Sequence, residues 1–437
     1  MSFWVLTMFV TLMALLMLGY PVAFTLGAVA LLYGGIFLGF DFFHLLPLQI
    51  WGVMTNFTLL AVPLFIFMGV ILDKSGLAED LLETMALLCG RLRGGLALSV
   101  VIVGALLAAT TGVVGATVVT MGIIALPTML KRRYSTPLAC GTIAASGTLG
   151  QIIPPSIILI LLGDVMGVPV GRLFIGAVVP GLLLVVMFLI YIIVYAWLRP
   201  EVGPVLEQAE DEKLMGRVVS TLIPPLLLVV GVLGSIFIGI ASPTESAAIG
   251  GIGAIILALL HRKLSLEKLQ DAMRLTTRLT SMVFLILIGA TAFGQVFRGM
   301  GGAGLVLDLM TSLPGGEWGF LAVSMLIIFL LGFFLDFLQI CFIVVPILAP
   351  IANTLHIDLL WLAILIGINL QTSFLTPPFG FSLFYLKAVA PPSVGIHDIY
   401  RGIIPFVILQ VIVMVLLILF PELTLWLPNV MDKILGT

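Results

Sequence analysis

Long apolar runs dominate the pattern of hydrophobic and polar positions along this chain. The run at 178–197, VVPGLLLVVMFLIYIIVYAW, contains no charged residue. A membrane-spanning helix needs about 20 predominantly apolar residues, whereas a membrane β-strand needs about ten residues of alternating polarity. Because the runs are long and do not alternate, we expect spanning helices. The predicted apolar segments are 3–19, 22–40, 57–72, 94–130, 138–163, 173–198, 218–240, 243–260, 279–297, 318–350, 359–390 and 402–420.

Composition agrees with a membrane location. Hydrophobic residues make up 61% of the 437 residues and charged residues make up 9%, compared with about 25% charged residues in soluble domains. The longest polar stretch, about 199–217, is too short to form a separate soluble domain. The N-terminus has no basic region before its apolar run, so we expect a retained helix rather than a signal peptide. The predicted fold class is therefore an all-α polytopic membrane protein.

Two predicted segments, 94–130 and 318–350, are longer than one crossing requires. Each has helix breakers near its middle: Thr111 and Gly112 in the first, and Gly332 in the second. A segment that is too long for one span and is broken at its centre is typical of a helical hairpin. We therefore predict two hairpins that enter the membrane and return.

Clusters of Lys and Arg predict the orientation, because cytoplasmic loops are enriched in these residues. If all the clusters are cytoplasmic, the 94–130 hairpin enters and returns on the cytoplasmic side, and both termini lie outside. The segment 74–93 is amphipathic and is expected to lie along the inner membrane surface. The clusters are Arg91 with Arg93, Lys131 to Arg133, Lys213 with Arg217, and the stretch 261–278.

The two halves of the chain carry matching polar interruptions. Residues 141–156 read GTIAASGTLGQIIPPS, and residues 367–380 read GINLQTSFLTPPFG. Each Pro-Pro pair begins 27 residues after an earlier proline, Pro127 or Pro350. Since the two segments run in opposite directions, they predict an inverted-topology repeat. The predicted divisions are scaffold helices at 1–56; a first repeat at 57–200 with an arm helix, the 94–130 hairpin and a broken helix at 138–163; scaffold helices and a cytoplasmic connection at 201–278; and a second repeat at 279–437 with the 318–350 hairpin and a broken helix at 359–390.

The Pro-Pro breaks point to an ion. Proline lacks a backbone donor and pushes the preceding residue out of helical geometry. Carbonyls near 150–153 and 373–376 therefore lose their helical partners, and in lipid they must be satisfied by protein, water or a ligand. Such carbonyls, with a hydroxyl from Thr111 or Thr376, form an oxygen cage that suits Na⁺. The alternative is that each break is only a structural kink.

Five segments, in order along nearly the whole chain, resemble the large membrane subunit of tripartite ATP-independent periplasmic (TRAP) transporters. The form NLQTSFLTPPFGFSLFYL is similar to the branch labelled for mannitol or chloroaromatic compounds, some of whose members handle 2-oxo and hydroxy monocarboxylates. The matching segments are PLFIFMGVILDKSGLA (63–78), TGVVGATVVTMG (111–122), GTLGQIIPPS (147–156), SPTESAAIG (242–250) and NLQTSFLTPPFGFSLFYLKAVAP (369–391).

The resemblance implies a Na⁺-coupled importer of a small organic acid in the bacterial inner membrane, with no organic cofactor. It implies an elevator mechanism, in which a transport domain with both hairpins and both broken helices moves against a fixed scaffold. It also implies two partners, a small four-helix membrane subunit and a periplasmic substrate-binding protein. The family's sodium sites correspond here to Thr111, Gly150, Ile153 and Pro155 for one ion, and to Gly332, Ser373, Thr376 and Phe379 for the other.

The chain departs from the common family pattern at two places. Family members have Ser-Gly-Ser at the first hairpin break, where this chain has Thr111-Gly112-Val113, and they often have Gly at the position of Ser373. A backbone carbonyl survives either change, so both ion sites are retained as predictions. The lost hydroxyl puts substrate contacts at the first break in doubt.

Polar residues inside the apolar runs are candidates for substrate binding, because such groups are costly in lipid. Asp336 can serve the ion cage, the substrate or the capping of a helix end. Asn369, Gln371 and Gln151 lie near the Pro-Pro breaks and are further substrate candidates. Glu245 lies in the sequence SPTE, which is instead typical of a capping box with Pro at the first helical position.

Other functions have weaker support. The sequence has no H-E-x-x-H, G-x-S-x-G or Walker A motif, which disfavours an intramembrane hydrolase and the direct use of ATP. A proton-driven or stand-alone carrier of another inverted-repeat family is the alternative, although such carriers use buried acidic or His relays and only Asp336 is clearly central. Two occluding hairpins also disfavour a channel.

Overall fold

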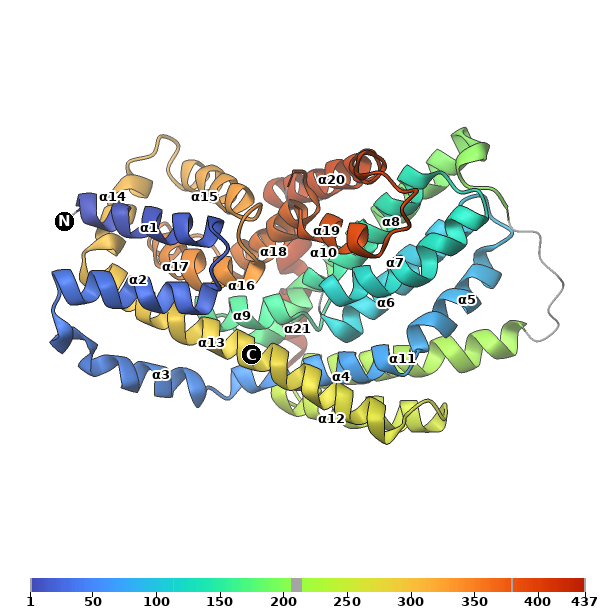
Figure 1. The fold of residues 1–437 in the computed structure, drawn as a ribbon, viewed down its shortest axis with the longest axis horizontal. Helices are drawn as coiled ribbons and strands as arrows, with labels where there is room; N and C mark the ends of the chain where they lie inside the picture. Colours follow the sequence, from blue (N-terminus) through green and yellow to red (C-terminus); the bar gives the residue numbers. More distant parts are fainter. Residues whose placement is uncertain (1, 113, 206–213, 379, 436–437) are drawn as a thin grey trace.

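The computed structural model describes residues 2–112, 114–205, 214–378 and 380–435, and in these ranges the regular secondary structure is helical, with no strand. The predicted all-α class is therefore confirmed. Many of the helices run along the long axis of the molecule (Figure 1). The helices are α1 (Ser2–Met17), α2 (Val22–Phe37), α3 (Leu46–Met54), α4 (Ala61–Lys74), α5 (Leu77–Cys89), α6 (Gly95–Thr111), α7 (Val114–Lys131), α8 (Thr136–Thr148), α9 (Ile157–Met166), α10 (Val170–Leu198), α11 (Leu214–Phe237), α12 (Pro243–Leu260), α13 (Leu266–Gly299), α14 (Gly302–Thr311), α15 (Glu317–Leu331), α16 (Phe337–Gln339), α17 (Val345–Thr354), α18 (Leu359–Leu375), α19 (Phe381–Val389), α20 (Ile396–Leu419) and α21 (Glu422–Leu435), with the 3-10 turns η1 (Phe40–Leu45), η2 (Thr58–Leu60), η3 (Leu149–Gln151) and η4 (Pro200–Val202) and the π-helical turn η5 (Ile340–Val344).

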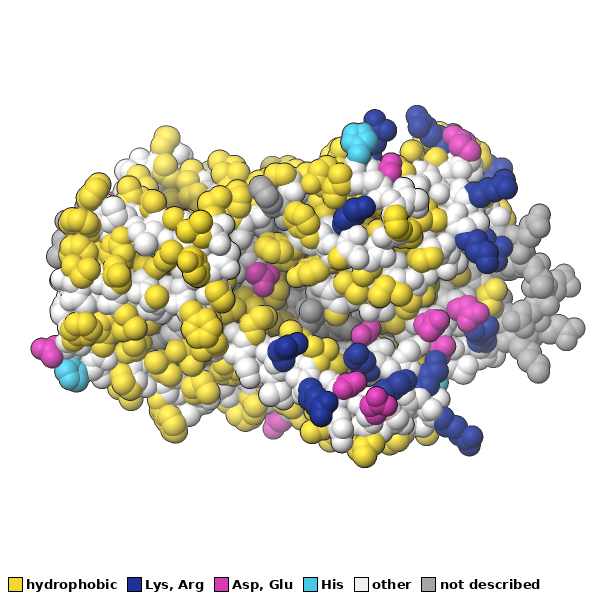
Figure 2. All heavy atoms as spheres, viewed as in Figure 1, with side chains coloured by type: hydrophobic (Ala, Val, Ile, Leu, Met, Phe, Trp, Pro, Cys, Tyr) yellow, Lys and Arg dark blue, Asp and Glu magenta, His cyan; other side chains and the backbone are white. Residues whose placement is uncertain are grey.

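The lengths and surfaces of these helices suit a membrane. Among the described residues, seven helices are long and apolar enough to cross one, and a bent pair at 40–54 and 58–74 turns by 54°. Large apolar side chains such as Trp51 and Leu227 stay exposed, which lipid favours. Lys and Arg side chains gather towards one end of the molecule in Figure 2. We assign that end to the cytoplasm because cytoplasmic loops carry the excess of these residues.

Both overlong segments fold as hairpins, as the sequence predicts. In the first, α6 packs against α7 and ends at Thr111, and the φ of +59° at the following Gly112 is left-handed. Glycine adopts this conformation without a steric penalty, which allows the chain to leave the helix there. In the second hairpin, α15 ends before Gly332 and the chain returns through α16, η5 and α17.

Each hairpin is followed by a helix that breaks at a Pro-Pro pair and then by a long span. The first broken helix consists of α8, η3 and α9 and leads into α10, whereas the second consists of α18 and α19 and leads into α20. The Pro154–Pro155 and Pro377–Pro378 peptide bonds are cis. The same order of hairpin, broken helix and span in both halves is the repeat that the sequence predicts.

The two repeats interlock through close helix contacts. Helix α8 packs along α20, and α18 packs against both α10 and α8. At the α8–α20 crossing, a Cβ on Gly141 would lie 2.0 Å from the carbonyl oxygen of Gly402, and a Cβ on Gly402 would lie 2.0 Å from that of Pro137. The two backbones are therefore in direct contact, which small residues permit in membrane helices.

A second group of helices packs beside this interlocked body. Helix α13 lies along α2 and α4, and α4 also packs on α12. The capping box predicted at the start of α12 is confirmed. A Glu245 carboxylate oxygen accepts a hydrogen bond from the Ser242 N–H at 2.8 Å, and Ser242 Oγ accepts one from the Glu245 N–H at 3.3 Å. This pairing satisfies two donors that the helix itself leaves unpaired.

The structure differs from the sequence prediction mainly at short or polar helices. The apolar pattern does not predict α3, α14 and α21, because each has fewer apolar residues than one span requires. Helix α13 begins at Leu266, so the predicted start of the second repeat at 279 falls inside a continuous helix. Its first turns are rich in charged residues, which a search for apolar runs does not detect.

Gly141→Val is expected to destabilise the protein, because the added side chain would overlap the Gly402 backbone. Overpacking of this kind costs about 1–3 kcal/mol, occasionally more. Thermal unfolding of the detergent-purified protein measures the effect. Gly231→Val in α11 is a matched control, since a Cβ at that glycine meets no atom within 4 Å. An unchanged unfolding temperature for Gly141→Val would contradict the close crossing.

Candidate functional site

The first Pro-Pro break lies against the end of the first hairpin arm. A Cβ on Gly150 would lie 3.5 Å from Cα of Ala108, and a Cβ on Gly112 would lie 3.6 Å from the backbone nitrogen of Ile157. The end of α6 is therefore a neighbour of both η3 and the start of α9. Thr111 is the last residue of α6, and its side chain lies outside the described part of the structure.

Two backbone oxygens at this break have no partner among the described residues. The Ile153 N–H donates to the Leu149 carbonyl at 2.9 Å, and Ser156 Oγ donates to the Gln151 carbonyl at 2.7 Å. In contrast, the carbonyls of Ile153 and Pro155 accept no hydrogen bond from any residue that the structure describes. Because no described residue engages them, these oxygens are available to a ligand.

The second break brings together residues from the other hairpin and the other broken helix. A Cβ on Gly332 would lie 2.1 Å from Oγ and 2.6 Å from Cβ of Ser373, so the end of α15 touches α18 directly. Ser373 Oγ donates to the Leu370 carbonyl at 2.9 Å. Phe379, the remaining residue predicted here beside Thr376, lies outside the described residues.

Thr376 follows the last residue of α18 and offers a hydroxyl oxygen. Its Oγ1 donates to the Thr372 carbonyl at 2.7 Å, which leaves the lone pairs of Oγ1 to accept or coordinate. The Thr376 carbonyl accepts from the Gly380 N–H at 3.1 Å. The Gly332 carbonyl, by contrast, accepts no hydrogen bond from the described residues. The second break therefore also provides carbonyl and hydroxyl oxygens.

One hydrogen bond joins the two repeats at equivalent positions. Gln371 Nε2 donates a long hydrogen bond of 3.4 Å to Thr148 Oγ1, and the two residues are 223 positions apart. The same offset separates Pro154 from Pro377. Equivalent residues of a two-fold repeat can touch only near its axis, so Thr148 and Gln371 mark the centre of the paired broken helices.

Amide groups near this centre lack partners. Gln151 and Gln371 are fully buried. Neither amide atom of Gln151, nor Oε1 of Gln371, has a hydrogen-bond partner among the described residues. Leaving a buried polar group unpaired costs about 1–3 kcal/mol. Because Thr148 and Gln151 lie three residues apart on one helical turn, the two glutamines are candidates for a single polar site.

The other two substrate candidates have partners inside the protein. Asn369 is buried, and its Nδ2 donates to the Met325 carbonyl at 2.7 Å, which ties α18 to α15. Asp336 is half-buried and caps α16 by accepting a hydrogen bond from the Phe337 N–H at 2.8 Å. These contacts favour structural roles for both residues, so Gln151 and Gln371 are the better candidates for substrate binding.

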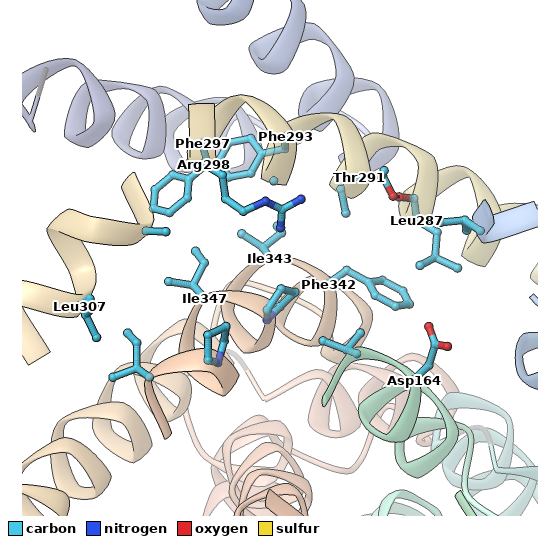
Figure 3. Close-up of a pocket in the computed structure, with 18 of the residues that line it drawn as sticks. Asp164, Leu287, Thr291, Phe293, Phe297, Arg298, Leu307, Phe342, Ile343 and Ile347 are labelled. Atoms are coloured by element: carbon cyan, nitrogen blue, oxygen red, sulfur yellow. The ribbon is translucent and has the colours of Figure 1, made fainter. Parts of the chain in front are cut away.

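A cavity of about 450 Å³ lies apart from the residues predicted for either ion site (Figure 3). Helices α13 and α14 form one wall, and η5 with α17 of the second hairpin forms the other. Arg298 from α13 and Asp164 from α9 point towards its interior from different sides. None of the predicted ion or substrate residues that the structure describes lines this cavity.

The sequence pattern indicates neither Thr148 nor Arg298 as part of a site. The offset between the two Pro-Pro pairs is the signal that identifies Thr148 as the counterpart of Gln371. No local pattern around Arg298 shows that it faces a cavity, because the opposite wall comes from the second hairpin, about fifty residues further along the chain.

Gly332→Ala is expected to destabilise the protein by about 1–3 kcal/mol, because the methyl group would overlap the side chain of Ser373. The double variant Gly332→Ala/Ser373→Gly removes the two atoms closest to the methyl group and should recover most of the loss. Thermal unfolding of the four proteins of this double-mutant cycle gives the coupling energy. Additive effects of the two changes would contradict the direct contact.

Comparisons with known proteins agree on one family. The family model described as "Tripartite ATP-independent periplasmic transporter, DctM component" matches residues 9–423. The C4-dicarboxylate TRAP transporter large permease protein DctM of Pseudomonas aeruginosa is 30% identical over 88% of this chain and 89% of its own length. The sialic acid TRAP transporter large permease protein SiaM of Vibrio cholerae is 28% identical over 95% and 96% of the two chains. The ectoine TRAP transporter large permease protein TeaC of Halomonas elongata is 30% identical over 96% and 98%.

The crystal structure of the YdaH transporter of Alcanivorax borkumensis has the same fold, with a TM-score of 0.65 over 95% of this chain and 98% of that one. At 14% identity this likeness concerns the fold alone. The sequence relatives are named as transporter permeases and not as enzymes. The chain therefore belongs to the DctM family, the large membrane component of tripartite ATP-independent periplasmic transporters, and is a multi-pass inner-membrane protein.

Proposed function

We propose that this chain is the permease of a Na⁺-coupled importer of a small organic acid that a periplasmic binding protein delivers. The observation that carries the proposal is the set of carbonyl oxygens that no described residue satisfies, those of Ile153 and Pro155 at the first Pro-Pro break and that of Gly332 beside the second. The proposed sodium ligands are Thr111, Gly150, Ile153 and Pro155 at the first break, and Gly332, Ser373, Thr376 and Phe379 at the second.

The chemistry of both breaks supports a monovalent cation with a preference for oxygen. Unwound carbonyls and the C-terminal ends of half-helices coordinate Na⁺ in carriers of this architecture. The carbonyls of Ile153, Pro155 and Gly332 can bind an ion without breaking a hydrogen bond to a described residue. The C-terminal ends of α8 and α18 add partial negative charge near the breaks. Among the described residues there is no group of three or more His, Cys, Asp or Glu that could hold a different metal.

An organic acid is the substrate class that the same breaks favour. The N-terminal ends of α9 and α19 carry partial positive charge, which suits a carboxylate. The neutral amides of Gln151 and Gln371 can both donate to and accept from a hydroxyl or oxo group, which favours a hydroxy or 2-oxo acid. The names of the relatives mention C4-dicarboxylates and sialic acid, which are carboxylic acids, and also ectoine.

The partners and the movement follow from the tripartite family. We infer that a small four-helix membrane subunit and a periplasmic substrate-binding protein complete the importer. The interlocked hairpins and broken helices form the moving body in this proposal, and the helices around α2, α4, α12 and α13 form the scaffold. Sliding of the first body past the second would carry both ion sites across the membrane as an elevator. The divisions at 1–56, 57–200, 201–278 and 279–437 belong to the same proposal.

A proton-driven carrier is the main alternative. Such a carrier needs a central acidic group that gains and loses a proton during transport. Asp336 is the candidate, but its carboxylate caps α16. Na⁺ coupling also accounts for the carbonyls of Ile153, Pro155 and Gly332, which no described residue pairs and which proton coupling leaves unexplained.

Uptake into proteoliposomes that contain this chain and its small subunit is expected to require an inward Na⁺ gradient and the loaded binding protein. The organic acid that the binding protein retains on purification is identified first. The binding protein is then loaded with a radiolabelled form of that acid. A proton gradient without Na⁺ should give no accumulation, because the breaks offer oxygen ligands rather than a proton relay. Accumulation driven equally well by protons would overturn Na⁺ coupling, and accumulation without the binding protein would indicate a stand-alone carrier.

A pair of threonine variants locates the coupling ion in the same experiment. Thr376→Val removes the proposed ligand oxygen, and the Na⁺ concentration for half-maximal uptake should rise about tenfold, equivalent to about 1.4 kcal/mol. Thr277→Val in α13 is the control, because Thr277 Oγ1 also donates to the carbonyl four residues earlier, at 2.8 Å. Equal shifts in the two variants would remove Thr376 from the site.

Gln151→Leu and Gln371→Leu are each expected to lower the uptake rate about tenfold at saturating loaded binding protein, with no loss of thermal stability. The reason is that both amide atoms of Gln151 and Oε1 of Gln371 have no partner among the described residues and are available to the substrate. Gln295→Leu in α13 is the matched control, since Gln295 is also buried with an unpaired Oε1. Unchanged uptake in both variants would indicate that the two amides bind buried water rather than the substrate.

A further inference from the structure

The cavity between α13 and the second hairpin has walls of a different chemistry from the ion sites. Helix α17 with η5 presents Ile343, Ile347 and Ile351 at helical spacing, and α13 presents Leu287 and Ala290 to the opposite side. Figure 3 shows these side chains, where labelled, turned towards a common space. Its volume of about 450 Å³ lies in the range of sites for small molecules, about 300–1,000 Å³.

Aliphatic walls of this kind select an apolar occupant. A small organic acid placed against them would lose hydration along most of its surface without gaining hydrogen bonds. A hydrocarbon chain loses nothing on leaving the bilayer for such walls, and the bilayer surrounds the protein with such chains. The substrate of the proposed function is therefore a poor occupant, whereas an acyl chain is a good one.

Arg298 provides the polar counterpart at the rim of the cavity. It lies in the last turn of α13, its side chain is exposed, and its guanidinium points into the space in Figure 3. No hydrogen bond or ion pair joins its guanidinium to a described residue. The other charged side chain of the lining is Asp164, one oxygen of which accepts from Asn56 Nδ2 at 2.5 Å. A guanidinium binds a phosphate through paired hydrogen bonds.

We propose that this cavity holds one acyl chain of a glycerophospholipid, with Arg298 bound to the lipid phosphate. The cavity lies towards the end of the molecule away from the gathered Lys and Arg side chains of Figure 2, so the lipid comes from the extracytoplasmic leaflet. Lipid supplies both parts of the chemistry, an apolar chain for the walls and an anionic group for Arg298.

The position of the cavity gives the lipid a consequence for movement. One wall belongs to α13 and α14, and the other belongs to the second hairpin, which the proposed function assigns to the moving body. A chain held between them stabilises the arrangement seen here, because it binds this conformation and not one in which the walls have separated or closed. The lipid site itself does not depend on Na⁺ coupling or on the identity of the substrate.

Native mass spectrometry of the full-length chain tests the site without substrate or Na⁺. The detergent-purified protein is stripped of lipid and titrated with dioleoylphosphatidylglycerol. Wild type should retain one lipid molecule against collisional activation, and Arg298→Gln should raise the half-saturating lipid concentration at least tenfold. Gly304→Leu should have the same effect, because Gly304 lines the cavity and a Cβ there meets no atom within 4 Å, so the larger side chain fills the space.

Matched controls separate this site from general lipid binding. Gly231→Leu in α11, where a Cβ also meets nothing within 4 Å, and Arg278→Gln, in the N-terminal half of α13 and outside the cavity lining, should both retain the lipid. Retention by Gly304→Leu with loss in Arg298→Gln would place the lipid on the surface and overturn the proposal. Displacement of the lipid by inorganic phosphate or succinate would overturn it in favour of a soluble anion.

A fluorescence measurement gives an independent readout if Gly304→Leu does not fold. Phe342→Trp places an indole in the cavity wall, and its added emission should be quenched by phosphatidylglycerol with brominated acyl chains. Arg298→Gln in the same background should need at least tenfold more lipid for the same quenching. Quenching that is absent, or equal in the two backgrounds, would contradict the site.

Discussion

The need to satisfy backbone polar groups in an apolar medium is the constraint on which the rest of this structure depends. Along the spans, each helix meets this need internally. At two places a Pro-Pro pair prevents it, and at the first of them no described residue pairs with the carbonyls of Ile153 and Pro155. A cation that enters such a break gains interactions that the protein does not otherwise use. The proposed sodium sites are a consequence of this local failure of the helix.

Internal repetition places the two broken helices side by side. The repeats interlock where the Gly141 and Gly402 backbones touch, which leaves no room for a side chain at either position. Thr148 and Gln371 then meet as equivalent residues of the two halves. The amide atoms of Gln151 and Gln371 that have no described partner belong to residues a few positions before the two Pro-Pro pairs. Ion ligands and candidate substrate ligands are thus held by a single packed body, as coupling between them requires.

The junction between this body and the neighbouring helices is packed differently. Inside the body, glycines allow backbones to approach until they touch, whereas between α13 and the second hairpin a cavity of about 450 Å³ remains. Tight contacts resist displacement because interiors at this density do not deform continuously. A space lined by alkyl side chains has no such interlocking. The difference in packing supports a boundary for movement at α13, and it also leaves an opening that a lipid chain can enter.

The sequence by itself determined the membrane location, the two hairpins, the two broken helices and the family, because each of these is a local property of composition or motif. Apolar length predicts spans, and Gly112, Gly332 and the Pro-Pro pairs interrupt helices wherever they occur. Only the tertiary structure decided which residues share a site. Asn369 and Asp336 have the residue types of ligands, yet their neighbours engage them as a brace between helices and as a helix cap. Arg298 lies near a helix end like other snorkelling cations, and it faces a cavity only because a distant hairpin forms the opposite wall. Contacts between segments far apart in the chain fix these roles, and local sequence does not specify such contacts.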